Sequence, residues 1–158
     1  MQTGRLWIVL LTAWFLHAAE TPAIDDSLKQ FAREVGAARK RKDADWMLQQ
    51  YPKSKMPPAI YAGFEEALRY HFSDGNLVVK DVKVHSFASY HPDAPAPGIH
   101  AGRPLKFIAP PTHWVVLEVG SLGSTSGPVT GPTTSSKLEI PVAKIGGAWK
   151  PVGLTYAK

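Results

Sequence analysis

The spacing of the apolar residues changes once along this chain, at Asp74-Gly75. Before that point they recur every three or four residues, the period of an amphipathic helix. After it they recur every second residue, the period of a strand with one buried face. Helices followed by strands predict an α+β fold in which N-terminal helices pack on a four-stranded antiparallel sheet.

Three helices are expected before Asp74. The first covers Ile24–Lys42 and begins at acids that can cap its free N–H groups. Its apolar stripe consists of Ile24, Leu28, Phe31, Val35 and Ala38. Asp43 can cap a second, short helix that Pro52 ends, and a third helix is expected from Pro57-Pro58. The apolar face of the third helix consists of Ile60, Tyr61, Phe64, Leu68 and Phe72.

Four consecutive cations, Arg39–Lys42, raise the question of a phosphate-binding patch. They stand at the C-terminal end of the first expected helix, where positive side chains complement the helix dipole. We therefore interpret this run as a helix end followed by a turn and not as a binding site.

Four strands are expected after Gly75, and the side chains of each alternate between two faces. The inward residues are expected to be Val78, Val82, Val84, Val115, Leu117, Val119, Leu138, Ile140, Val142, Val152, Leu154 and Tyr156. Gly146-Gly147 predicts a hairpin before the last strand. Pro141 and Pro151 lack an amide donor and should lie at a sheet edge or a bulge.

Two long connections interrupt the strands. Residues 89–111 hold six of the fourteen prolines, and residues 121–136 are almost all small and polar. Both exceed the two to six residues that usually connect elements. Such loops are either functional or mobile, and these compositions favour mobility.

The N-terminus predicts export. Arg5 precedes the apolar run Leu6–Leu16, and small residues follow at Ala18 and Ala19. This order is typical of a secretory signal peptide, and the apolar run is too short to span a bilayer. The alternative is an uncleaved anchor or a buried first helix. We expect a signal peptide at residues 1–19, one domain at residues 20–158, and a periplasmic or secreted location.

Composition excludes several classes of protein. The chain has no cysteine, so neither a disulfide framework nor a lipid-anchored N-terminal cysteine is available. Eighteen Lys and Arg against thirteen Asp and Glu give a net charge of +5, a modest excess. No nucleic-acid-binding motif accompanies that charge, so no nucleic-acid partner is expected, and no membrane span is expected after signal cleavage.

The order of elements resembles the nuclear transport factor two-like superfamily, whose members form a cystatin-like cone with a curved sheet. The stretches that carry the resemblance are the first helix running into KDADWMLQQY and the closing hairpin IPVAKIGGAWKPVGLTY. The resemblance implies a pocket between the helices and the concave face of the sheet. Members of this superfamily are enzymes or non-catalytic binding domains, and the enzymes commonly place an Asp–His pair inside the cone.

The sequence offers weak candidates for chemistry. Asp81 and His85 share a strand face, but it is opposite the valines and so away from any pocket, unless a bulge between Leu77 and Lys83 reverses the facing. Neither a nucleophile motif nor a phosphate-binding loop is present, so no cofactor is expected. His91, Asp93 and His100 fall in one loop without the paired spacing of zinc sites, and no metal is expected.

Two binding sites are expected from the aromatic residues. Trp114 and Trp149 are placed on the outer face of the sheet, which predicts a homodimer or partner interface centred on them, unless the long loops cover them. Tyr61, Phe64 and Tyr156 could line a small apolar pocket, with a filled core as the alternative. The expected function is therefore an exported, non-catalytic binding or interaction module, with a small-molecule isomerase, dehydratase or hydrolase using Asp81 and His85 as the alternative.

Overall fold

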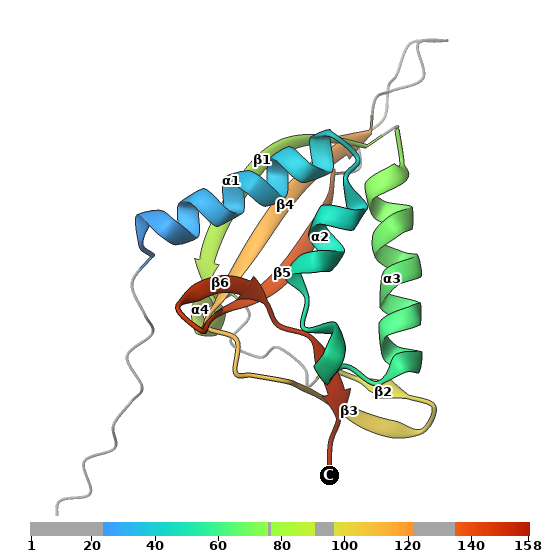
Figure 1. The fold of residues 1–158 in the computed structure, drawn as a ribbon. Helices are drawn as coiled ribbons and strands as arrows, with labels where there is room; N and C mark the ends of the chain where they lie inside the picture. The colour runs from blue at the N-terminus through green and yellow to red at the C-terminus, as the bar shows by residue number, and fades with distance from the viewer. Residues whose placement is uncertain (1–23, 76, 91–96, 122–134) are drawn as a thin grey trace, which may run out of the picture.

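The fold is known from a computed structural model that describes residues 24–75, 77–90, 97–121 and 135–158. It confirms an α+β architecture in which α1 (Asp26–Lys40), α2 (Ala44–Gln50) and α3 (Pro58–Ser73) lie on one side of an antiparallel four-stranded sheet (Figure 1). The other helical elements are the 3-10 turn η1 (Lys53–Lys55) and α4 (Phe87–Tyr90). The strands are β1 (Leu77–Ser86), β2 (Ile99–His100), β3 (Arg103–Phe107), β4 (His113–Ser121), β5 (Ser135–Ile145), β6 (Ala148–Pro151) and β7 (Leu154–Tyr156). The expected signal peptide lies outside the described residues.

Acids cap the first two helices as predicted, although α1 begins at Asp26, two residues after the expected Ile24. The Asp25 carboxylate accepts a hydrogen bond from Leu28 N (2.7 Å), and the Asp43 carboxylate accepts one from Trp46 N (3.0 Å). Each side chain thereby satisfies one of the backbone donors that a helix leaves free at its start. The buried stripe of α1 then packs against β1 and forms the centre of the core.

The cationic run at the end of α1 contains one residue that is not a surface group. Arg39 is buried, and its guanidinium donates to the backbone carbonyls of Phe72, Asp74 and Leu77 at distances between 3.0 and 3.3 Å. These carbonyls belong to the end of α3 and the start of β1. Arg39 therefore joins the end of α1 to the end of α3 and the start of β1, whereas its position in the sequence predicted a role only at the end of its own helix.

The main sheet has the order β1-β4-β5-β6, with every neighbouring pair antiparallel. Its inner face carries the aliphatic residues of β4 and β5 that the alternation predicted, and these pack beneath the helices. Gly146 and Gly147 form the predicted hairpin turn between β5 and β6, both with positive φ angles (60° and 83°). Positive φ at both central residues is what a two-residue hairpin of this kind requires.

The predicted facing of Val78 is wrong. The β1–β4 pairing skips one residue between Val79 and Asp81, so Lys80 forms a bulge. Because side chains alternate with period two, the extra residue exchanges the faces on its two sides. Val79 is therefore buried on the same face as Val82 and Val84, which are partly buried against the core, whereas Val78 is exposed.

The last expected strand is divided between two sheets. β6 ends at Pro151, and after Val152-Gly153 the chain forms β7, which pairs with β3 in a second sheet of order β2-β3-β7. Residues 97–107, which were expected to be mobile loop, thus supply two strands of that sheet. Pro151 lies in the edge strand β6, as predicted. Pro141 lies just before the β5–β6 ladder begins, where its carbonyl accepts from Val152 N (2.8 Å).

The short helix α4 covers part of the sheet face that points away from α1. Phe87 stacks on Trp114 (centroids 4.9 Å apart, planes at 11°), and Tyr90 stacks on His85 (4.4 Å, 18°). Within the described ranges, no helix is both long enough and apolar enough to cross a membrane.

Candidate functional site

The main cavity of the described residues arises from an incomplete wall beside β5. β6 pairs only with Val142–Ile145, so the earlier part of β5 does not have β6 beside it. In Figure 1, α3 stands on that side, where it packs against α2. Side chains of α3 on one side and of β5 on the other therefore enclose a space between them.

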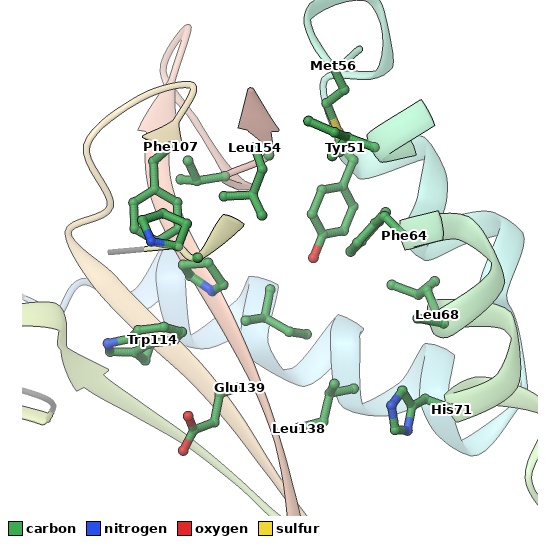
Figure 2. Close-up of a pocket in the computed structure, with 18 of the residues that line it drawn as sticks. Tyr51, Met56, Phe64, Leu68, His71, Phe107, Trp114, Leu138, Glu139 and Leu154 are labelled. Carbon is green, nitrogen blue, oxygen red and sulfur yellow. The ribbon is translucent and has the colours of Figure 1, made fainter. Parts of the chain in front are cut away.

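This space is a pocket of about 790 Å³ (Figure 2). Its volume is within the ~300–1,000 Å³ that small-molecule sites usually have. The pocket is lined by Tyr51, Met56, Ile60, Phe64, Ala67, Leu68, His71, Phe87, Pro97, Gly98, Phe107, Trp114, Leu138, Glu139, Ile140, Pro141, Val152, Gly153 and Leu154. Four of these side chains carry a polar atom, so the walls are almost entirely apolar.

Tyr51 is the most informative residue of the pocket. It follows α2 directly, is only 8% exposed, and its ring packs on Phe64 with centroids 4.2 Å apart. Figure 2 shows its hydroxyl directed into the space between the two walls, and no residue of the described ranges forms a hydrogen bond with that hydroxyl. Burial raises the pKa of Tyr51 above its ordinary value, so the phenol keeps its proton and can donate it in a hydrogen bond.

The remaining polar side chains lie at the borders of the pocket. His71 is exposed and lies near Leu138, at the end opposite Met56 (Figure 2). The Glu139 carboxylate points away from Tyr51 in the same view and accepts a hydrogen bond from Tyr90 Oη (3.0 Å). Tyr51 is thus the polar group that faces the interior of the pocket.

The residues expected to bind a ligand are brought together only in part. Phe64 lines the pocket, but Tyr61 and Tyr156 do not. The ring of Tyr61 lies under the Lys53 ammonium group (4.7 Å). The Tyr156 hydroxyl is hydrogen-bonded to His100 Nδ1 (3.0 Å). Tyr51 was missed because its position before Pro52 marks a helix end, and nothing in the sequence shows where its hydroxyl points.

Asp81 and His85 do not meet in the pocket. Both lie on the face of the sheet that points away from α1, opposite Glu118 and Trp114 of β4. The Asp81 carboxylate is 3.4 Å from Lys83 Nζ, and the His85 ring is stacked on Tyr90. The bulge at Lys80 precedes both residues and leaves them facing outwards, so neither reaches a ligand held beside Tyr51.

The two tryptophans lie on opposite faces of the sheet, so no single surface contains both. Trp114 is on the outer face under Phe87, and it also borders the pocket. The expected outer position of Trp149 is wrong. Trp149 is on the helix side, 6% exposed, and its Nε1 donates to Asp25 Oδ1 (3.1 Å) and Ser27 Oγ (3.0 Å).

The error has a structural cause. The expected face of Trp149 was inferred from the alternation of Val152, Leu154 and Tyr156, but the strand breaks between Pro151 and Leu154, so that alternation does not extend back. A homodimer through the outer face stays a prediction, with Trp114 as its remaining residue.

Three histidine and acid positions were considered as metal ligands. His91 and Asp93 lie outside the described residues, and His100 is bonded to Tyr156. In the part of the chain that the structure describes, no three His, Cys, Asp or Glu side chains are close enough to hold a metal ion.

Comparisons with protein-family models, with curated protein sequences and with solved structures give no match for this chain. The geometry and chemistry of the pocket are therefore the basis for any statement about function.

Proposed function

We propose that this chain is an exported, non-catalytic binding protein whose pocket takes an elongated apolar ligand carrying one hydrogen-bond acceptor. The observation that carries the proposal is the Tyr51 hydroxyl, which belongs to a residue only 8% exposed, points into an apolar pocket, and forms no hydrogen bond with any described residue. A buried polar group without a partner costs about 1–3 kcal/mol. A ligand that displaces water from the pocket must therefore offer this hydroxyl an acceptor, or it incurs that cost.

The apolar walls would supply most of the affinity. Each CH₂ group of a ligand that moves from water into the pocket contributes about 0.8 kcal/mol. Tyr51 would add orientation, because its hydroxyl lies between the wall formed by α3 and the wall formed by β5. A carbonyl, ester or protonated carboxyl group at one end of a hydrocarbon chain fits this arrangement. A fatty acid would bind with its carboxyl group protonated, because burial opposes charge.

The proposal includes the location of the protein and its family. Export is supported by the charged, apolar and small-residue order of the first nineteen residues. Membership of the cone-forming superfamily is supported by the helix-then-strand order and by a pocket between α3 and the sheet. Fractionation of cells that express an epitope-tagged chain tests export: the tag should leave the cytoplasm, and a tag retained in full there contradicts it.

Blocking the pocket tests the binding function. Ala67 and Ala62 are both exposed alanines on α3, but only Ala67 lines the pocket. Ala67→Trp should fill the pocket and abolish binding of a fluorescent long-chain fatty acid by the purified protein. Ala62→Trp is the matched control and should bind this probe as the unsubstituted protein does.

Thermal unfolding of both variants shows that each is folded before binding is compared. If the unsubstituted protein does not bind the probe, or if Ala67→Trp binds as well as Ala62→Trp does, the pocket is not a site for acyl ligands.

A further inference from the structure

One end of the molecule contains Lys and Arg residues but no Asp or Glu in the segments that form it. Three segments lie at this end, residues 52–64, 97–108 and 152–158, and none of them contains Asp or Glu. Met56, next to η1, packs against Gly153, whose carbonyl accepts from Ile108 N just after β3 (2.9 Å). These contacts hold η1 beside the β2-β3-β7 sheet, near the C-terminus in Figure 1.

The cations of this end differ from those elsewhere in their partners. Lys53, Lys55, Arg103 and Lys106 are exposed, and none of them forms a salt bridge with any residue that the structure describes. Lys53 and Arg103 instead lie over tyrosine rings. Many cations in other regions are paired with carboxylates, for example Lys29 with Asp26, Arg69 with Asp45 and Glu65, Lys83 with Asp81 and Glu118, and Lys144 with Asp25.

The same end exposes an aliphatic side chain beside the pocket. Ile99 is 74% exposed and lies in β2, which a two-residue turn at Ala101-Gly102 joins to β3. Gly98, the residue before Ile99, is exposed and lines the pocket. The β2–β3 hairpin therefore carries its exposed isoleucine at the border of the pocket, close to Arg103 and Lys106.

We propose that the β2–β3 hairpin and η1 dock this protein on an anionic lipid surface, from which the pocket takes its ligand. The proposal rests on the proposed function, since it makes the ligand a lipid or fatty acid of that surface. Unpaired ammonium and guanidinium groups are attracted to anionic headgroups, and an exposed aliphatic side chain can enter the acyl boundary.

An acidic protein is the other partner that this charge could attract. The lipid surface fits better because the cations surround an exposed isoleucine and an apolar pocket, both of which match acyl chains. An acidic protein partner would account for the positive charge but not for the exposed isoleucine or the apolar pocket beside it.

Sedimentation with vesicles tests the docking. The purified protein should bind vesicles of phosphatidylcholine mixed with phosphatidylglycerol, and should bind vesicles of phosphatidylcholine alone far more weakly. Replacing Lys53 and Lys55 together by Gln should lower the partition coefficient about 25-fold, because each cation near an anionic surface contributes about a fivefold factor. Ile99→Ser should lower it about tenfold, because the apolar burial of the isoleucine is lost.

Matched variants separate docking from general attraction. Lys40 and Lys42 are exposed, unpaired cations at the end of α1, so replacing both by Gln removes the same charge from a different region. That pair should change the partition coefficient less than about threefold. Tyr70→Ser, which removes an aromatic side chain that is 69% exposed on α3, should leave it unchanged.

Two results would overturn the docking proposal. One is equal binding, or no binding, to the two kinds of vesicle; no binding to either would point to an acidic protein as the partner. The other is an equal loss for both lysine pairs. Titration of the fluorescent fatty acid without vesicles keeps the two proposals apart, because the Lys53, Lys55 and Ile99 variants should bind that probe normally.

Discussion

Replacing Tyr51 by Phe should weaken ligand binding without lowering the stability of this protein. The hydroxyl borders the pocket and forms no hydrogen bond with any described residue, so the fold gains no hydrogen bond from it. Removing the hydroxyl should leave the free energy of unfolding unchanged or raise it by up to about 1 kcal/mol. The effect is small because a hydroxyl that borders the pocket is only partly desolvated. For a chain of this length that is a rise in Tm of up to about 4 °C.

Binding should change in the opposite direction. A ligand whose acceptor is bonded to Tyr51 loses one hydrogen bond, worth about 0.5–1.5 kcal/mol, so its Kd should rise about two- to twelvefold. A hydrocarbon of the same length without an acceptor should bind both forms equally. Urea unfolding measures the first effect, and competition against a fluorescent fatty acid measures the second.

Tyr156→Phe is the control, because the Tyr156 hydroxyl is already hydrogen-bonded to His100. That variant should lose about 1 kcal/mol of stability and should bind ligand normally. The reasoning is refuted if Tyr51→Phe is destabilised by more than Tyr156→Phe, because the Tyr51 hydroxyl would then have a partner in the ligand-free fold.

Three further predictions concern the fold. Gly63→Ala should stabilise α3 by up to about 1 kcal/mol, because a Cβ there contacts nothing within 4 Å. Gly36→Ala should not give this gain, because its Cβ would lie 2.7 Å from Val82 Cγ2. Urea unfolding compares the two variants. Arg39→Met should cost about 2–4 kcal/mol by the same assay, because three backbone carbonyls lose their donor. Hydrogen bonds from Ser27 and Leu28 lower the pKa of Asp25 from 3.8 to about 2. Its contribution is therefore complete above about pH 4 and is lost as the pH falls through 2, so the urea midpoint of Asp25→Asn should fall less across that range.

The helices were predictable because their signals are local. A capping carboxylate acts on N–H groups two or three residues away, so Asp25 and Asp43 can be recognised from the sequence alone. The glycine pair at Gly146-Gly147 is likewise recognisable, since few residues adopt positive φ at both positions.

The facing of strand residues was predictable only where the strands run without interruption. In β4 the alternation is regular, and Val115, Leu117 and Val119 are all buried. The bulge at Lys80 reverses the facing of the residues before it, so the predicted face of Val78 is wrong. The break after Pro151 does the same for the residues of β6, so the predicted face of Trp149 is wrong. Neither interruption has a strong local signal.

The pocket could not be located from the sequence because it depends on how far one strand extends beside another. β6 is short and leaves part of β5 facing α3, and this single feature brings Tyr51, Phe64 and Leu138 around one space. Phe64 was identified because it lies on the apolar face of α3. Tyr51 lies at the end of α2, where burial and a free hydroxyl become visible only after packing.

A crystal structure of the protein grown with a long-chain fatty acid tests the central claim most directly. We predict electron density for the hydrocarbon chain between α3 and β5, with an oxygen of the ligand within hydrogen-bonding distance of the Tyr51 hydroxyl. Density for the fatty acid at another place, or a Tyr51 hydroxyl bonded to the protein while the pocket is closed by side chains, would contradict the account.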